Sequence, residues 1–351
     1  MMKKILRKEA KKMKKTHKIF AFVLAFLILF SGCNAEKPEE TTLDIAVNTA
    51  IGQKNLFGVK ENKNLLTGNE GFSAGTAICD WTAIAYKEFE IEDDFEGYLS
   101  ELEQKVTEEY AAEGGLDSTK ATEWHRTILV VTALGGDATA FGTHPDGTKI
   151  DLVADGIYNY INEDLANQGI NGFIYALLAL DCGNYEIPEG SRYTRESIIE
   201  SLIAEQHEDG SFGFGSRSDA DMTAMALHAL APYSDEPEIK KVIDEGIAFL
   251  SSAQNGDGSF SGMDSKTSES ISQVIIALCA NGIDPKTDER FIKHGTSVYD
   301  ALFDFRQKDK TFSHTIDAEK GDALANDQAM IAFMALINFE NGKSGAFIFT
   351  D

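Results

Sequence analysis

Two acidic residues, Asp219 and Asp221, stand directly before a run of small and apolar residues in the stretch QHEDGSFGFGSRSDADMTAMALHAL (206–230). A carboxyl group that is shielded from water and kept neutral can donate a proton in catalysis. A carboxylate can instead bind a ligand, or it can cap the open N–H groups at the start of a helix. Which role Asp221 has depends on where its helix lies in the fold.

The loop that precedes this helix is repeated along the chain. QHEDGSF (206–212) returns as QNGDGSF (254–260), and a more divergent copy, QKDKTF, covers 307–312. In the first two copies the Asp-Gly pair is typical of a turn, because aspartate accepts a local N–H bond and glycine adopts positive φ. A calcium loop is not predicted, since the alternating acids that end in glutamate are missing.

Each loop is followed by a segment that is apolar on nearly every face, as expected for a helix buried on all sides. Three more segments of this kind occur upstream without the loop. The six segments begin at Asp80, Glu123, Asn171, Asp221, Glu269 and Asp327. A spacing of about 40 to 60 residues indicates a repeat architecture.

Amphipathic segments alternate with the apolar ones. Their apolar residues follow i, i+3, i+4, i+7 spacing, which predicts helices that cover a core on one side. They lie near 43–51, 95–106, 150–165, 195–206, 239–250 and 291–305. We therefore predict an all-α fold, an (α/α)6 toroid with six inner and six outer helices over residues 43–351, and only minor sheet content.

The QxxDGSF loops that alternate with helices resemble those of squalene cyclases and protein prenyltransferases, whose last motif residue is usually tryptophan. DADMTAMALHAL is also similar to the corresponding helix start in transcobalamin-type vitamin carriers, which share the toroid. This resemblance implies the toroid fold for nearly all of the mature chain. It does not select a function, because the fold hosts enzymes, carriers and thioester domains.

In such a ring the inner helices run the same way, so their N-termini meet at one mouth. Several polar groups among large aromatic side chains are typical of a ligand pocket. The predicted ligand-binding residues are Asp80, Trp81, Glu123, Trp124, His125, Asn171, Tyr175, Asp219, Asp221, Glu269, Gln273, Asp327 and Gln328. The alternative for any single acid in this set is a helix cap that also meets the positive end of the helix dipole.

One interpretation of this mouth is enzymatic. In class II terpene cyclases a DxDD motif supplies a protonated aspartate, and Asp219 and Asp221 match its first and third positions. Asp221 would then be the catalytic acid, but Met222 replaces the fourth residue. Zinc-dependent prenyltransferase activity is not predicted, since the Asp-x-Cys ligand pair is missing. We predict no metal site.

The interpretation that we favour is a non-catalytic binding module that holds a small ligand at the mouth. Resemblance to transcobalamin-type carriers implies a corrinoid such as cobalamin, and carboxylates beside aromatic rings also suit a glycan. Those carriers close over the ligand with a separate β-domain, so a lid-like partner protein is expected. A structural or adhesive surface domain is a further alternative.

The N-terminal 32 residues predict export. The first eighteen carry nine Lys or Arg and one acid, and an apolar run, IFAFVLAFLILF, covers 19–30. A basic start, a short apolar centre and a small-residue exit describe a secretory signal. FSGC (30–33) resembles a bacterial lipobox, which implies lipidation of Cys33. We therefore predict a signal peptide over 1–32, a polar linker over 33–42 and an extracytoplasmic protein anchored to the bacterial membrane through Cys33.

The charge of the chain excludes one class of partner. The net charge is −25 over the whole sequence. Without the leader it is 23 bases against 56 acids, or −33. Such a chain is repelled by phosphate backbones, so nucleic acid is not an expected partner.

Overall fold

The computed structural model describes residues 40–262 and 265–349. The predicted signal peptide, the lipidation site Cys33 and residues 34–39 of the predicted linker lie outside this range. From Thr41 onward the chain forms one compact unit. Among the described helices, none combines the length and the apolar character that a membrane span requires.

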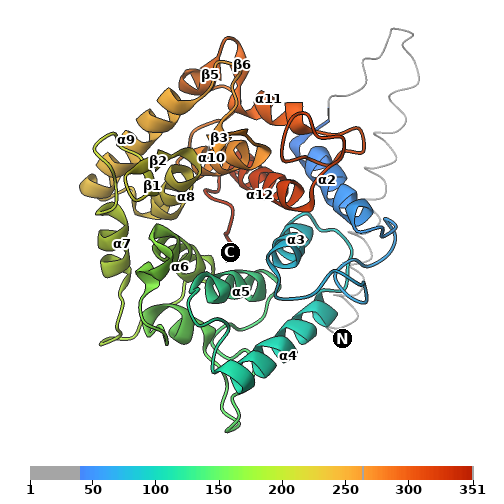
Figure 1. Cartoon of the computed structure of the whole chain (residues 1–351), viewed down its shortest axis with the longest axis vertical. Coiled ribbons are helices and arrows are strands. Elements are labelled where there is room, and N and C mark those ends of the chain that lie inside the picture. Colours follow the sequence, from blue (N-terminus) through green and yellow to red (C-terminus); the bar gives the residue numbers. More distant parts are fainter. Residues whose placement is uncertain (1–39, 263–264, 350–351) are drawn as a thin grey trace, which may run out of the picture. The chain divides into compact units, whose positions relative to one another are not determined.

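Six helices form a closed ring around a common centre (Figure 1). The space that their inward-facing side chains enclose is called the lumen. Along the chain each helix contacts the next, and the last contacts the first. They are α3 (Ala77–Glu88), α5 (Thr122–Ala133), α6 (Ile170–Cys182), α8 (Ala220–Leu230), α10 (Ser268–Ala280) and α12 (Ala323–Glu340). Most of their residues are buried, which explains why these segments are apolar on almost every face. The six inner helices of the predicted toroid are confirmed.

An outer layer packs against this ring. It comprises α2 (Thr42–Leu56), α4 (Phe95–Glu113), the π-helical turn η1 (Ala154–Tyr158), α7 (Arg195–Ile203), α9 (Pro237–Ala253) and α11 (Val298–Leu302). In α9, the i, i+3, i+4 pattern places Ile239, Val242 and Ile243 in the core. The molecule is thus mainly helical, as predicted.

Two of the predicted outer helices are shorter than their patterns suggested. In 150–165, Asp151 accepts the N–H groups of Val153 and Ala154 and so caps a helical turn, but this turn continues as a π-helix that ends at Tyr158. Only η1 and the 3-10 turn η2 (Leu165–Gln168) form there.

In 291–305, His294 and Gly295 both adopt positive φ and turn the chain. This turn joins β5 (Ile292–Lys293) to β6 (Thr296–Ser297). The helix α11 therefore begins only after Ser297, whose side chain forms a capping box with Asp300. The remaining 3-10 turns are η3 (Ala231–Tyr233), η4 (Glu289–Phe291) and η5 (Phe303–Phe305).

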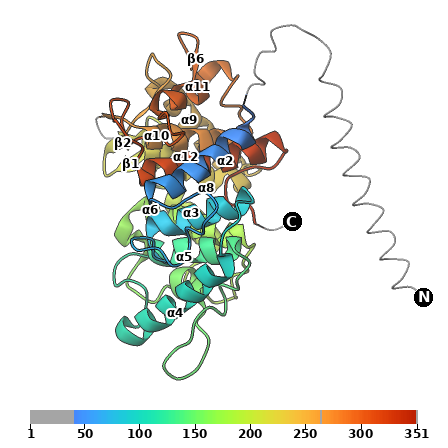
Figure 2. The same ribbon diagram turned by 90° about the vertical axis from the view of Figure 1, so that its right-hand side faces the viewer.

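The repeated loops form short antiparallel hairpins before the inner helices. β1 (Phe212–Phe214) pairs with β2 (Arg217–Asp219), and β3 (Ser261–Gly262) pairs with β4 (Ser265–Lys266). Figure 2 shows the first hairpin on one face of the ring and the C-terminal segment on the other.

The repeated motif has a structural role in each copy. Gln206 donates through Nε2 to the carbonyls of Gly210 and Val242, which ties the loop to α9. Phe212 is fully buried. Gly210 has φ +83°, and a Cβ there would lie 2.6 Å from the carbonyl oxygen of Glu245. The motif therefore specifies the fold, because its residues join neighbouring repeats and none of them lines the lumen.

Candidate functional site

The side chains that face the lumen are arranged in rows, one row for each turn of the inner helices. Equivalent positions of different helices line the same cavities, so the helices run in the same direction. The middle row consists of Trp81, Arg126, Tyr175, Met225, Gln273 and Gln328. Residues four positions earlier on the same helices form an upper row nearer the mouth, and residues three positions later form a lower row.

The upper row carries two carboxyl groups on adjacent helices. Asp221 and Glu269 are each the second residue of their helix, four positions before Met225 and Gln273. Asn171 has the equivalent position on α6 and lines the mouth cavity. The three side chains thus stand side by side where α6, α8 and α10 begin, which is the arrangement expected from the aligned repeats.

Asp221 has the environment of a proton donor. Burial raises its pKa to about 6, and the negative charges of Asp219 and Glu269 contribute, while a hydrogen bond from Ser270 opposes the shift. Its Oδ1 atom is buried and has no hydrogen-bond partner among the described residues. A carboxyl group in this state is neutral at mildly acidic pH and can donate to a bound molecule.

Glu269 has a different environment. Its carboxylate accepts a hydrogen bond from Nδ1 of His314 at 2.8 Å, and the His314 side chain is 55% exposed. The hydroxyl of Ser268 donates to the same carboxylate at 3.1 Å. Two neighbouring carboxyl groups in unlike environments are the arrangement that separates an acid from a base.

A cavity of about 280 Å³ lies at the level of the middle row, one helical turn below Asp221 and Glu269, which do not line it. It is lined by Trp81, Thr122, Arg126, Gln168, Asn171, Tyr175 and Met225. This volume is near the lower end of the range for small-molecule sites. The Oδ1 atom of Asn171 is buried and has no hydrogen-bond partner within the described chain, so it can accept a donor from a ligand.

Arg126 is the cationic group of this cavity, and two carboxylates already neutralise it. Its Nε atom donates to Asp80 at 2.7 Å, and a terminal nitrogen donates to Glu123 at 2.5 Å. Tyr98 and the N–H of Gly75 also donate to Asp80. The guanidinium is thereby held in a fixed orientation beside the pocket.

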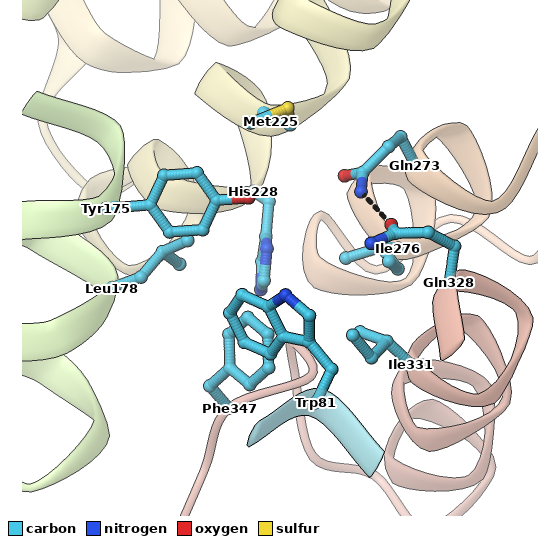
Figure 3. A pocket seen from close by; sticks show the side chains of 10 residues that line it. All are labelled: Trp81, Tyr175, Leu178, Met225, His228, Gln273, Ile276, Gln328, Ile331 and Phe347. Carbon is cyan, nitrogen blue, oxygen red and sulfur yellow. Dashed lines mark hydrogen bonds between the residues drawn. The ribbon is translucent and has the colours of Figure 1, made fainter. Parts of the chain in front are cut away.

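The lower row closes the lumen beneath the cavity. Leu178, His228, Ile276 and Ile331 surround a space of only about 20 Å³, enough for one water molecule. Phe347 enters this space from the C-terminal segment and stacks on Trp81, with ring centroids 5.6 Å apart (Figure 3). Nε2 of His228 accepts a hydrogen bond from the N–H of Ala346 at 3.3 Å. Burial lowers the His228 pKa to about 4, so this ring is neutral.

Seven of the predicted ligand-binding residues share the lumenal register, but Asp221 and Glu269 line neither cavity. The five that line the cavities are Trp81, Asn171, Tyr175, Gln273 and Gln328. The last two are joined by a hydrogen bond of 2.5 Å (Figure 3). Burial raises the pKa of Tyr175 to about 12.

Other predicted residues have partners away from the lumen. Trp124 is fully buried and donates to the hydroxyl of Tyr110 on α4. His125 bonds the carbonyl of Gly156 on η1 at 2.9 Å. The presence of both tryptophans in the predicted set thus does not mark one pocket, because only Trp81 lines the cavity.

The remaining acids of the predicted set have structural partners. Asp80 pairs with Arg126, and Asp327 accepts hydrogen bonds from Gln53 and Thr82 behind the inner ring. Glu123 is partly exposed at the rim, also paired with Arg126. Asp219 caps α8 by accepting the N–H of Met222 at 2.9 Å.

Nine residues that line the cavity or its floor are not in the predicted set. They are Thr122, Arg126, Gln168, Leu178, Met225, His228, Ile276, Ile331 and Phe347. On α6, Asn171, Tyr175 and Leu178 follow i, i+4, i+7 spacing. The same spacing on α8 leads from Asp221 to Met225 and His228, so this pattern could have identified both residues. In the described part of the chain, no three His, Cys, Asp or Glu side chains gather where they could share a metal ion.

Comparisons with known proteins agree with this architecture. The family model of the prenyltransferase alpha-alpha toroid domain matches residues 159–329. The unsaturated glucuronyl hydrolase of Bacillus sp. GL1, described as responsible for the degradation of glycosaminoglycan, superposes with a TM-score of 0.54. The match has 12% identity and covers 88% of this chain and 98% of that one.

The chain has the alpha/alpha toroid fold. A point mutant of the unsaturated glucuronyl hydrolase of Streptococcus agalactiae, in complex with dGlcA-GalNAc6S, gives a TM-score of 0.52 with 8% identity. That match covers 86% of this toroid and 93% of the enzyme. A search of curated proteins found no match.

These neighbours correct our functional prediction. We expected a non-catalytic module that binds a corrinoid or a glycan, but the two solved structures described above are those of unsaturated glucuronyl hydrolases. The preference against an enzyme was therefore wrong. No comparison bears on the transcobalamin resemblance, which stays a prediction.

Proposed function

We propose that this toroid is a glycoside hydrolase, with Asp221 as general acid and Glu269 as general base. The observation that carries the proposal is Asp221 itself: a half-buried carboxyl in the upper row with a pKa of about 6 and a buried oxygen that has no hydrogen-bond partner within the described residues. The hydrolase neighbours support the reaction class, because they use the same fold on glycans. At their low sequence identity, the roles of individual residues must come from this chain alone.

In the proposed reaction, Asp221 and Glu269 each take part in one proton transfer. Asp221 donates its proton to the glycosidic oxygen while the bond between that oxygen and the anomeric carbon breaks. A water molecule attacks the anomeric carbon and gives its proton to Glu269. Exchange with solvent then reprotonates Asp221 and deprotonates Glu269, which restores the site. This division of roles is that of paired carboxyl groups in inverting glycosidases.

The cavity suits the sugar on which this reaction acts. Trp81 and Tyr175 offer aromatic faces, with ring centroids 6.3 Å apart, and apolar sugar faces pack on such rings. Asn171 Oδ1 can accept a sugar hydroxyl. The volume of about 280 Å³ suits one ring rather than a chain of several.

An uncharged sugar fits the electrostatics better than a uronic acid. Arg126 is already neutralised by Asp80 and Glu123, while Asp221 and Glu269 add negative potential. A carboxylate-bearing sugar would be repelled by this group unless it displaced Glu123 from the guanidinium. A uronic acid is the second candidate, because one terminal nitrogen of Arg126 makes no hydrogen bond within the described residues.

The test is hydrolysis by the full-length chain. A panel of 4-nitrophenyl monoglycosides is offered, including the β-glucoside and the β-glucuronide, together with dGlcA-GalNAc6S. We expect release from a neutral glycoside and strong loss of activity in Asp221→Asn. If no compound of the panel is turned over faster by the wild type than by Asp221→Asn, the proposal is wrong.

We also propose that the enzyme is exported and tethered to the bacterial membrane through a lipid on Cys33, from the lipobox-like FSGC alone. A surface enzyme would meet glycans outside the cell, so location and reaction are compatible. Metabolic labelling with an alkyne fatty acid tests this proposal. We expect label on the wild type and none on Cys33→Ser. Equal labelling of both would exclude the anchor. The expected lid-like β-domain partner is tested in the same cells by cross-linking.

A further inference from the structure

The C-terminal segment contributes to the wall of the lumen although it lies outside the ring of repeats. After α12 the chain turns back, and Phe347 lies between Trp81 and His228. Figure 3 shows the Phe347 ring directly beneath the indole of Trp81. The segment enters from the face opposite the β1–β2 hairpin (Figure 2).

Two contacts hold the segment in this position. The N–H of Ala346 donates to His228, and Asn338 on α12 donates through its side chain to the carbonyl of Gly345. Both Gly345 and Ala346 are buried. A Cβ added to Gly345 would lie 3.3 Å from Nε2 of His228, so the backbone approaches the histidine closely.

Phe347 therefore forms the floor of the site. Without Phe347, the lumen beneath Trp81 would be bounded only by the lower row of the inner helices. With it, the remaining space holds about one water molecule. The cavity of about 280 Å³, which Thr122 and Asn171 of the upper row help to line, opens towards the mouth.

The rows also fix how a sugar lies in this pocket. Asp221 stands in the upper row, so the bond that it cleaves lies at the mouth and the leaving group remains outside. The opposite end of the ring, which carries the C4 hydroxyl, then points down towards Trp81 and Phe347. A substituent on that hydroxyl would meet the floor.

We propose that Phe347 is a specificity-determining residue that limits the pocket to a terminal sugar with a free C4 hydroxyl. This inference rests on the proposed function for the direction of the ring, but it concerns binding and can be tested without turnover. Replacement of Phe347 by alanine removes most of an aromatic side chain and deepens the pocket. Extra methyl groups are discriminated about 10- to 200-fold by a closed apolar pocket.

The test compares the binding of free sugars by calorimetry, using the full-length chain. The ligands are D-glucose and D-galactose, each with its 4-O-methyl ether. We expect wild type to bind the better parent sugar at least about tenfold more tightly than its ether. In Phe347→Ala the ratio should fall to about threefold or less. Phe349→Ala is the matched control, since Phe349 contacts Phe347 but does not line the pocket, and should keep the wild-type ratio.

The possible results separate this inference from the proposed reaction. An unchanged ratio in Phe347→Ala overturns the inference, and so does the absence of binding of all four sugars to the wild type. Binding with the expected ratios, in a chain that hydrolyses no glycoside, supports the floor and contradicts the reaction. Thermal shift with toluene checks that the variant is folded and deepened. We expect stabilisation of Phe347→Ala and none of the wild type, because a new apolar cavity binds small aromatic molecules.

Discussion

Two acids at the starts of inner helices, Asp80 and Asp221, have opposite environments. Asp80, the fourth residue of α3, is fully buried behind the lumen and accepts hydrogen bonds from Arg126, Tyr98 and Gly75. Asp221, the second residue of α8, lies in the upper row above the lumen and has one oxygen without a partner. Relative to the middle row, Asp80 lies one position before Trp81, about 100° around its helix, whereas Asp221 lies four positions before Met225, within about 40° of the lumenal face. Register, not residue type, separates the structural acid from the candidate catalytic one.

The largest expected effect is on catalysis by the lumenal acid. Asp221→Asn keeps the shape of the side chain and removes its proton, so kcat should fall about 10²- to 10⁴-fold. Asp327→Asn is the matched control, because Asp327 lies at another inner-helix start and faces Gln53 and Thr82. It should leave kcat within about twofold. Equal losses of kcat in the two variants would mean that Asp221 is no more important for catalysis than Asp327.

The next largest expected effect is on the free energy of unfolding when the structural acid, Asp80, is replaced. Asp80→Ala leaves Arg126 buried without its main partner, and breaking such a pair costs about 3 to 5 kcal/mol. Urea denaturation should show a free energy of unfolding reduced by this amount. Asp221→Ala, which leaves no buried partner charge, is the control. A loss below about 1 kcal/mol for Asp80→Ala would mean that the pair contributes little.

The substitution Asp221→Asn should also stabilise the fold, by an amount that depends on pH. The pKa of Asp221 is raised from 3.8 to about 6, so its charged form destabilises the folded state. Asp221→Asn should therefore raise the free energy of unfolding by about 1 to 3 kcal/mol above pH 6. The gain should diminish as pH falls from 6 to 4, because the folded wild type then binds a proton. A constant difference across this range would contradict the shift.

The smallest expected effect is a shift of the pH–rate profile when Asp219, the neighbour of Asp221, is replaced. Asp219→Ser retains a helix cap, which Asp219 now provides through the N–H of Met222. It removes a negative charge that raises the pKa of Asp221. The alkaline limb of the pH–rate profile should move to lower pH by a fraction of a unit. Asp209→Ser, in the preceding loop, should leave the limb in place.

Much of the fold could be predicted because the repeats are explicit in the sequence. The six apolar segments are the six inner helices, and the QxxDGSF loops join neighbouring repeats as motifs of the fold. The two outer segments that differed contain features that act locally. Asp151 bonds to the backbone two and three residues on, and His294-Gly295 turns the chain into a hairpin. Amphipathic spacing does not detect either effect.

The site could be predicted only in part. Alignment of the helix starts found Asp221, Glu269 and Asn171, which share one register position. It also grouped them with Trp124 and His125, whose side chains face α4 and η1, since helix starts alone do not say which face points inward. Phe347 could not be found in this way, because it lies outside the repeats and reaches the lumen only through the turn after α12.

The ionisation of Asp221 tests the central claim most directly. Carboxyl ¹³C chemical shifts of aspartate-labelled full-length protein can be followed between pH 3 and 8, with Asp221→Asn to assign the signal. The account predicts a resonance that titrates near pH 6 and disappears in the variant. A resonance assigned to Asp221 that titrates near 3.8 would mean that this carboxyl is an ordinary charged helix start, and the proposed proton donor would be excluded.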